Sequence, residues 1–156
     1  MKRDSRLARM IHVLIHMGLL GGRETSETIA KMLNTNPVVV RRTMAALKRN
    51  GVVDSEGGRG GGWVLLRSLD DLTVLDIQKA LDEGEVLAAG ISEDHPTCPV
   101  ERAANAALVQ AFDKAESALL DEFAKLRLSI IAEHAISDEK QGIPPPDGRE
   151  DDGKQR

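Results

Sequence analysis

Residues 36–63 read NPVVVRRTMAALKRNGVVDSEGGRGGGW, and this segment is the most informative about the fold of the chain. Asn36 is a favourable helix N-cap and Pro37 a favourable first helical residue, so a helix is predicted from Pro37 to about Asn50, closed by Gly51. Two short apolar runs follow, with five glycines and one arginine between them, which is typical of a β-hairpin with a permissive tip. A cationic helix followed by such a hairpin outlines a winged helix-turn-helix.

The segments before and after this stretch add further helices. Apolar residues recur at helical spacing over residues 4–20, and two glycines then end that helix. Thr25 or Ser26 can cap a second, short helix, and Thr73 can cap another that runs to Gly84. The predicted fold class is mainly α with a small β-hairpin.

A long apolar periodicity runs from about Pro99 to His134. A helix of about 35 residues would be about 50 Å long, far longer than the basic module, so its apolar stripe needs a second surface, and a second subunit is the natural one. Residues 137–156 contain three prolines and acidic runs and are expected to be disordered. The predicted division is a winged helix-turn-helix domain (1–84), a sensor-type loop (85–100), a dimerisation helix (101–136) and a tail (137–156).

Charge is divided unevenly along the chain. Residues 1–67 contain 12 Lys/Arg and 5 Asp/Glu, a net +7, whereas residues 68–156 contain 9 Lys/Arg and 20 Asp/Glu, a net −11. Such asymmetry indicates a basic working surface on the first module only. One cysteine cannot form an intramolecular disulfide, and no apolar run reaches the length of about 18 residues that a membrane span needs. A cytoplasmic protein without a membrane partner is therefore expected.

The basic helix and the hairpin suit the two grooves of double-stranded DNA. The major groove, about 12 Å wide, admits one helix, whose first turns meet base edges. An arginine on a thin glycine-rich loop can enter a narrow A·T-rich minor groove, where negative potential is concentrated. Hydroxyls, amides and N–H groups at turns and helix starts hold phosphates. The candidate DNA-binding residues are Ser26, Thr35, Asn36, Val38, Val39, Arg41, Arg42, Lys48, Arg49, Arg59 and Gly60.

These residues also have interpretations that do not involve DNA. A cationic helix face is often only solvated, and a glycine-rich hairpin can be a surface turn with an incidental arginine. A nucleotide-binding loop is excluded because it needs Gly-Lys-Ser/Thr at the opening of a helix, whereas Trp63-Val64-Leu65-Leu66 follows here. Trp63 is expected to close the hairpin onto the core rather than stack on bases. A protein-interaction module without DNA is the alternative function, and no nucleophile–base pair supports an enzyme.

Several segments resemble the signature of the Rrf2 family of bacterial winged-helix transcription regulators. They are residues 36–47, 51–55 and 57–65, followed by 72–81 after the wing. The family includes the iron–sulfur-cluster regulator IscR, the nitric-oxide-sensing repressor NsrR and the cysteine-metabolism repressor CymR. The resemblance covers about residues 4–134 and implies a homodimer whose long helix crosses onto the partner subunit. We therefore expect a dimeric repressor that binds a pseudo-palindromic operator.

The cysteines differ from those of the best-known members. The members that carry a cluster use three closely spaced cysteines before the long helix, and this sequence has Cys98 alone. Iron–sulfur clusters take four ligands, mostly thiolates, so no cluster and no other cofactor is expected. His12 with His16, and His95 with Cys98, have spacings that a metal ion could use. Packing or surface roles are the simpler interpretation, and no metal site is predicted.

Cys98 is nevertheless the candidate sensor. A helix N-terminus close to it favours the reactive thiolate, and His95 and Arg102 are near in sequence. Oxidation to a sulfenic acid, or a disulfide with Cys98 of the partner subunit, would alter the dimer. The alternatives are an unreactive thiol packed under the long helix and a regulator that responds to a small ligand without redox chemistry.

Overall fold

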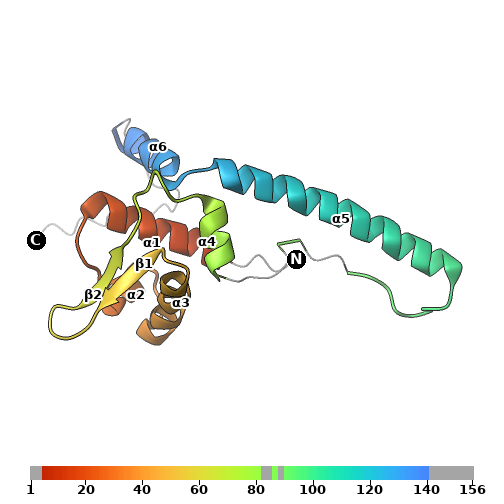
Figure 1. Cartoon of the computed structure of the whole chain (residues 1–156), viewed down its shortest axis with the longest axis horizontal. Helices are drawn as coiled ribbons and strands as arrows, with labels where there is room; N and C mark the ends of the chain where they lie inside the picture. Colours follow the sequence, from red (N-terminus) through yellow and green to blue (C-terminus); the bar gives the residue numbers. More distant parts are fainter. Residues whose placement is uncertain (1–4, 82–85, 88–89, 141–156) are drawn as a thin grey trace, which may run out of the picture.

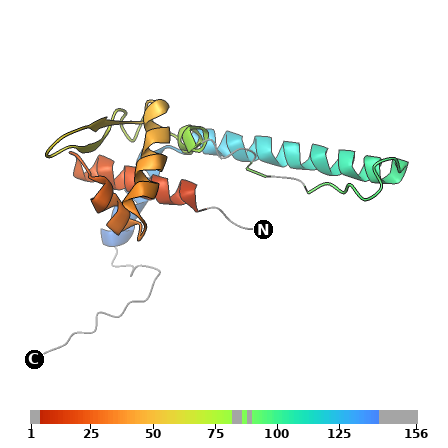
Figure 2. The same cartoon turned by 90° about the horizontal axis from the view of Figure 1, so that it is seen from below.

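The computed structural model describes residues 5–81, 86–87 and 90–140, and it shows a helical body with a hairpin on one side and a long helix extending from it (Figure 1, Figure 2). The elements are α1 (Arg6–Leu20), α2 (Ser26–Met32), α3 (Pro37–Arg49), β1 (Val53–Glu56), β2 (Gly62–Leu65), α4 (Val74–Leu81), α5 (Pro99–Lys125) and α6 (Leu128–Lys140). This order confirms the predicted fold class, mainly α with one antiparallel hairpin.

Local capping explains where the helices of the body begin. The Thr25 hydroxyl accepts a hydrogen bond from the Thr28 N–H at 3.1 Å, and the Asn36 side chain accepts one from the Val38 N–H at 2.8 Å. Thr73 starts α4 through a reciprocal pair, in which its N–H donates to the Asp76 carboxylate and the Asp76 N–H donates to its hydroxyl. These are the caps that the sequence predicts.

The hairpin is tied to the body through the residue before α2. Strands β1 and β2 pair antiparallel with Val53 opposite Leu65 and Glu56 opposite Gly62. On the other side of β2, Glu24 and Trp63 exchange two backbone hydrogen bonds, of 3.0 and 2.8 Å. A side chain at Gly62 would come within 2.9 Å of the Glu24 carbonyl oxygen, so the close approach of these two segments requires a glycine there.

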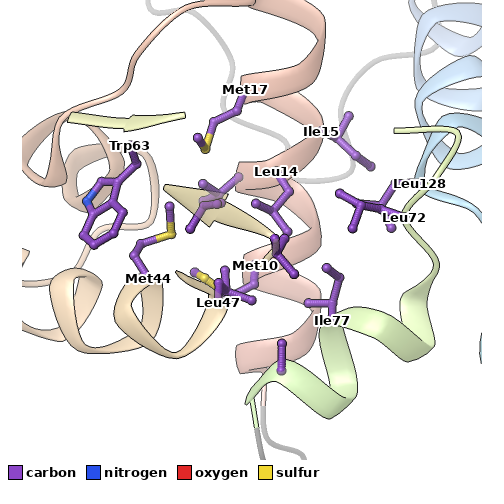
Figure 3. Close-up of a cluster of buried hydrophobic side chains, with 14 of the residues drawn as sticks. Met10, Leu14, Ile15, Met17, Met44, Leu47, Trp63, Leu72, Ile77 and Leu128 are labelled. Atoms are coloured by element: carbon purple, nitrogen blue, oxygen red, sulfur yellow. The ribbon is translucent and has the colours of Figure 1, made fainter. Parts of the chain in front are cut away.

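A single apolar core joins these elements (Figure 3). Leu14 of α1, Met44 and Leu47 of α3 and Ile77 of α4 are fully buried in it. Trp63 of β2 is also buried, and this confirms the prediction that it closes the hairpin onto the domain. The core packs α3 beside the hairpin, so the two candidate DNA-binding elements belong to the same packed body.

The prediction of a single long helix is wrong. The chain forms two helices, α5 and α6, separated by Leu126 and Arg127. The backbone of Leu126 is extended, and its carbonyl oxygen accepts a hydrogen bond from the Val74 N–H at 2.9 Å. The Leu128 N–H donates to the Leu72 carbonyl oxygen at 2.9 Å, and the Leu128 side chain is fully buried. Burial of Leu128 and this short backbone pairing stabilise the break.

The domain boundaries change as a result. Helix α6 packs against α1, and Ala132 is buried in the core with Leu128. The body therefore comprises α6 in addition to the predicted segment 1–84. Residues 137–140 are the last turn of α6 and not the start of a tail, and the remaining residues of the predicted tail, 141–156, lie outside the described residues. The predicted end of α4 at Gly84 also lies outside them.

Helix α5 extends away from the body, as Figure 1 shows. It has 27 residues, which corresponds to a length of about 40 Å, and none of its residues is buried in the single chain. Val100, Leu108 and Val109 are exposed apolar residues on it. Residues 92–95 lie against its first half, where Asn105 makes two hydrogen bonds with the Ser92 backbone and the Glu101 carboxylate accepts one from the His95 N–H.

Among the described residues, no helix combines the length and the apolar character that crossing a membrane requires.

Candidate nucleic-acid interface

The outer face of α3 presents basic and apolar side chains to solvent. Because successive helical residues are rotated by about 100°, Val38, Arg42 and Arg49 lie on the side opposite the buried Val40 and Met44. Val38 is 63% exposed, and both arginines are exposed. Within the described part of the chain, neither Arg42 nor Arg49 has an ion pair or a hydrogen-bond partner for its guanidinium group. This face is free to meet base edges.

The turn before α3 offers fewer free groups than its sequence suggests. The Asn36 side-chain oxygen is used to cap α3, so only its amide NH₂ group remains for an outside partner. Thr35 is half-buried, and its N–H donates to the Ala30 carbonyl oxygen at 2.9 Å. Asn34 adopts a left-handed conformation with φ of 49°, which asparagine tolerates better than most residues. Thr35 and Asn36 remain at the edge of the surface, close to the start of α3.

The structure corrects the prediction that Ser26 belongs to the DNA-binding residues. Its side chain is buried, and its hydroxyl accepts a hydrogen bond of 2.9 Å from the indole N–H of Trp63. Since this hydroxyl joins α2 to the hairpin inside the domain, the structure does not place it among the exposed groups that could hold a phosphate. The sequence gives no signal for this contact, because the two residues are 37 positions apart.

The side of α3 that faces the hairpin carries cations that are already paired. Arg41 contacts the Glu27 carboxylate at 2.7 Å, and Lys48 contacts Asp54 at 3.1 Å and the Ser55 hydroxyl at 2.8 Å. These acidic partners are part of the site, and sequence reasoning did not find them. The sequence alone does not distinguish Arg41 and Lys48 from Arg42, although a phosphate would have to compete with a carboxylate for either of the paired cations.

Both carboxylates are held in their ionised form. A hydrogen bond from its own backbone N–H is the largest influence and lowers the pKa of Glu27; burial opposes it, and the hydrogen bond and charge of Arg41 lower the pKa further. The Ser55 N–H, followed by Lys48, lowers the pKa of Asp54. Since both pKa values shift downward, both ion pairs persist at neutral pH and throughout the range in which an ordinary carboxylate is ionised.

The tip of the hairpin, residues 57–61, forms the second half of the interface, which we call the wing tip. Gly58 and Gly60 have φ values of 87° and 77°, a region that favours glycine, and they stand on either side of the exposed Arg59. A side chain at Gly61 would come within 2.2 Å of the Glu56 carbonyl oxygen. Within the described residues, Arg59 has no hydrogen-bond or ion-pair partner. The turn therefore presents a single free cation.

An open groove lies between the hairpin and the start of α2, with Arg41 as its one lining residue from α3. Glu27 and Arg41 line one side of it, and residues 55–58 and 60–62 line the other. A helix is the element that a major groove admits, and a thin loop carrying an arginine is one that a narrow minor groove admits. The combination of α3 and the wing tip therefore suits duplex DNA.

The candidate sensor lies far from this surface. Cys98 is a half-exposed free thiol at the N-cap of α5, at the end of that helix that points away from α3 (Figure 1). Among the described residues, no group of three or more His, Cys, Asp or Glu side chains is placed to hold a metal ion. The rings of His12 and His16 on α1 lie 4.7 Å apart, and burial together with the charge of His16 lowers the pKa of His12.

Comparisons with known proteins agree with this geometry. The model of the Rrf2 family, described as iron-dependent transcriptional regulators, matches residues 3–134. YwnA of Bacillus subtilis (strain 168), a candidate HTH-type transcriptional regulator, is 34% identical over 131 residues, which cover 84% of this chain and 97% of YwnA. The resemblance noted in the sequence is therefore confirmed.

Solved structures share the fold. A candidate DNA-binding protein superposes with a TM-score of 0.66 at 31% identity, covering 81% of this chain and 98% of its own. CymR, the global cysteine regulator of B. subtilis, superposes with a TM-score of 0.61 at 23% identity, covering 86% of this chain and 98% of its own. From the outer face of α3, the wing and these matches together, we conclude that the chain belongs to the Rrf2 family of DNA-binding transcriptional regulators and is not an enzyme.

Proposed function

We propose that the protein is a homodimeric repressor that binds a pseudo-palindromic operator through α3 and the wing tip of each subunit. The observation that carries this proposal is that Arg42 and Arg49 on α3 and Arg59 on the wing tip are exposed and have no partner among the described residues. Val38 and Val39 of α3 would contact thymine methyl groups, and Asn36 and Thr35 would contact phosphate. A dimer bound across a promoter represses by excluding other proteins from it.

The proposed dimer rests on α5. A helix of 27 residues without a single buried side chain, carrying exposed Val100, Leu108 and Val109, is stabilised when a second copy covers its apolar residues. Two-fold symmetry would then present two α3 helices to successive major grooves, about 34 Å apart along the duplex. Symmetry of the protein predicts matching symmetry of the operator. The cytoplasmic location expected from the sequence stays a prediction.

The test is binding of the pure protein to a duplex from the promoter of its own gene, followed by fluorescence anisotropy at several salt concentrations. We expect tight binding that weakens steeply with salt, because each phosphate contact releases counterions with a slope of about −0.9 per contact. A footprint with two symmetric halves is also expected. Equal affinity for unrelated duplexes, or no affinity for any, would favour the alternative of a protein-interaction module.

We also propose that oxidation of Cys98 modulates DNA binding. A peroxide would oxidise the half-exposed thiol to a sulfenic acid with release of water, at the point where α5 begins. Since α5 is the proposed dimer helix, a change at its start would alter the spacing of the two α3 helices. Cys98→Ser protein should bind DNA equally well with and without peroxide, whereas wild type should lose affinity after peroxide. Identical affinity of wild type in both states would exclude the thiol switch and favour a small ligand as signal.

An iron–sulfur cluster does not fit the donor set of this chain. The sequence supplies one thiolate, whereas clusters take four ligands that are mostly thiolates. We therefore propose that the protein carries no cluster. Anaerobically purified protein should be colourless, with no absorption band in the visible region of its ultraviolet–visible spectrum. A charge-transfer band in the visible region of that spectrum would overturn this proposal.

A further inference from the structure

We propose that Arg23 is a positioning residue for Arg59, because its guanidinium group holds the wing tip in the conformation from which Arg59 enters the minor groove. The inference rests on the proposed DNA-binding function and adds the residue that orders the wing. Arg23 lies in the connection between α1 and α2, outside both of the elements that the sequence marks as DNA-binding.

One guanidinium group joins two parts of the hairpin. Its Nη2 atom forms an ion pair with the carboxylate of Glu56, the last residue of β1. Its Nη1 atom donates a hydrogen bond of 3.4 Å to the carbonyl oxygen of Gly60, the residue that follows Arg59. Arg23 therefore links the end of β1 to Gly60 of the wing tip, the residue next to Arg59.

The backbone of Arg23 is itself well anchored. The next residue, Glu24, exchanges two backbone hydrogen bonds with Trp63, which is buried in the core. Trp63 is further held by its hydrogen bond to Ser26 at the start of α2. Arg23 thus reaches the wing tip from an anchored position in the body. We call its contacts with Glu56 and Gly60 the brace.

The wing tip needs such a contact because its own structure supplies little order. Four of its five residues are glycine, which loses more conformational freedom on ordering than any other residue. Within residues 57–61 the structure describes one backbone hydrogen bond, from the Gly61 N–H to the Gly58 carbonyl oxygen at 3.1 Å. A loop that must be ordered during binding weakens that binding, so a contact that orders it beforehand raises the affinity of the wing.

A direct phosphate contact by Arg23 is the alternative explanation. A substitution of Glu56 distinguishes between the two explanations. Glu56→Gln removes the ion pair of the brace but leaves the Arg23 charge and adds one net positive charge per subunit. If Arg23 acts by bracing the wing tip, this variant loses discrimination in the minor groove. If Arg23 binds phosphate, the variant binds every duplex more tightly and its salt dependence becomes steeper. The two explanations therefore predict changes in different quantities: bracing changes the discrimination between A·T and G·C pairs, whereas a phosphate contact changes the overall affinity and the salt slope.

The experiment uses a duplex that full-length wild-type protein selects from a random library. This duplex is made in two versions, with A·T or with G·C pairs at the positions that the wing tip contacts. Fluorescence anisotropy gives the ratio of the two dissociation constants and the salt slope. We expect Glu56→Gln to lower the ratio about two- to fivefold, within the range of an exposed ion pair, with an unchanged salt slope. Arg23→Lys, which keeps the charge but loses the two-pronged geometry, should lower the ratio equally.

Two controls test whether the effect passes through Arg59. Asp70→Asn removes the same charge from an exposed position that does not line the groove, so it should preserve the ratio. In Arg59→Ala protein, adding Glu56→Gln should leave the already reduced ratio unchanged. A further fall of the ratio in this double variant would overturn the proposal, as would a wild-type ratio in Arg23→Lys. Thermal unfolding of every variant should match wild type, because the substituted groups are exposed.

Failure of this inference can be told apart from failure of the proposed function. Wild-type protein that selects no sequence from the library would refute sequence-specific binding, and the brace with it. Wild-type protein that selects an operator and discriminates its flanks through Arg59, while Glu56→Gln keeps the full ratio, would overturn the brace alone.

Discussion

An Arg42→Ala protein is expected to bind its operator at least about 30-fold more weakly than wild type. Arg42 lies on the outer face of α3 with no partner among the described residues, so both of its terminal nitrogens can donate to a guanine. A bidentate arginine–guanine contact discriminates by about 1–3 kcal/mol. Since a dimer makes this contact in both half-sites, the loss is at least about 2 kcal/mol, which corresponds to about 30-fold in the dissociation constant.

The measurement is a set of dissociation constants for wild type and variant on the operator and on duplexes with one base pair changed at a time. Wild type should lose affinity at the base pair that Arg42 contacts, and Arg42→Ala should be indifferent to it. Lys79→Ala, which removes one charge from an exposed site on α4, is the matched control and should bind like wild type. If Arg42→Ala weakens all duplexes equally and lowers the salt slope by about 1 per subunit, Arg42 holds a phosphate instead.

Replacing Leu128 by alanine is expected to lower the free energy of unfolding by about 2–5 kcal/mol. Leu128 is fully buried beside Leu72 (Figure 3), where its backbone also pairs with that residue at 2.9 Å. Truncation leaves a cavity where α6 meets the body, and the neighbouring backbone pairing prevents the chain from collapsing into it. A loss of this size is a large share of the 5–15 kcal/mol that stabilises a typical domain.

Urea unfolding followed by circular dichroism measures this effect. The control is Leu20→Ala, a change of the same chemistry at the last residue of α1, where the side chain is 70% exposed and little contact is lost. It should unfold close to wild type. A cost below about 1 kcal/mol for Leu128→Ala would show that Leu128 does not anchor α6, and that the break between α5 and α6 has another cause.

Much of the body could be predicted because its signals are local. The cap at Asn36, the proline after it and the spacing of Val40, Met44 and Leu47 mark α3 with its buried face. Glycines on both sides of Arg59 mark the turn, since positive φ values are needed there. Each signal acts within a few residues, so a single sequence was enough to place both DNA-binding elements.

The break between α5 and α6 could not be predicted in the same way. The apolar spacing continues across Leu126, so periodicity alone favours one helix. What ends α5 is the pairing of Leu126 and Leu128 with the segment before α4, more than 50 positions earlier in the chain. Helical hydrogen bonds lost at the break are replaced by this pairing, and burial of Leu128 adds to it.

The cationic helix, the glycine-rich wing with one arginine and the single cysteine can all be identified from the sequence, because caps, periodicity and composition are properties of neighbouring residues. Which cations are free depends on the packing of the folded chain. This packing pairs Arg41 with Glu27 and Arg23 with Glu56, and it buries Ser26 against Trp63. These partners come from segments far apart in the chain, and packing of the core brings them together.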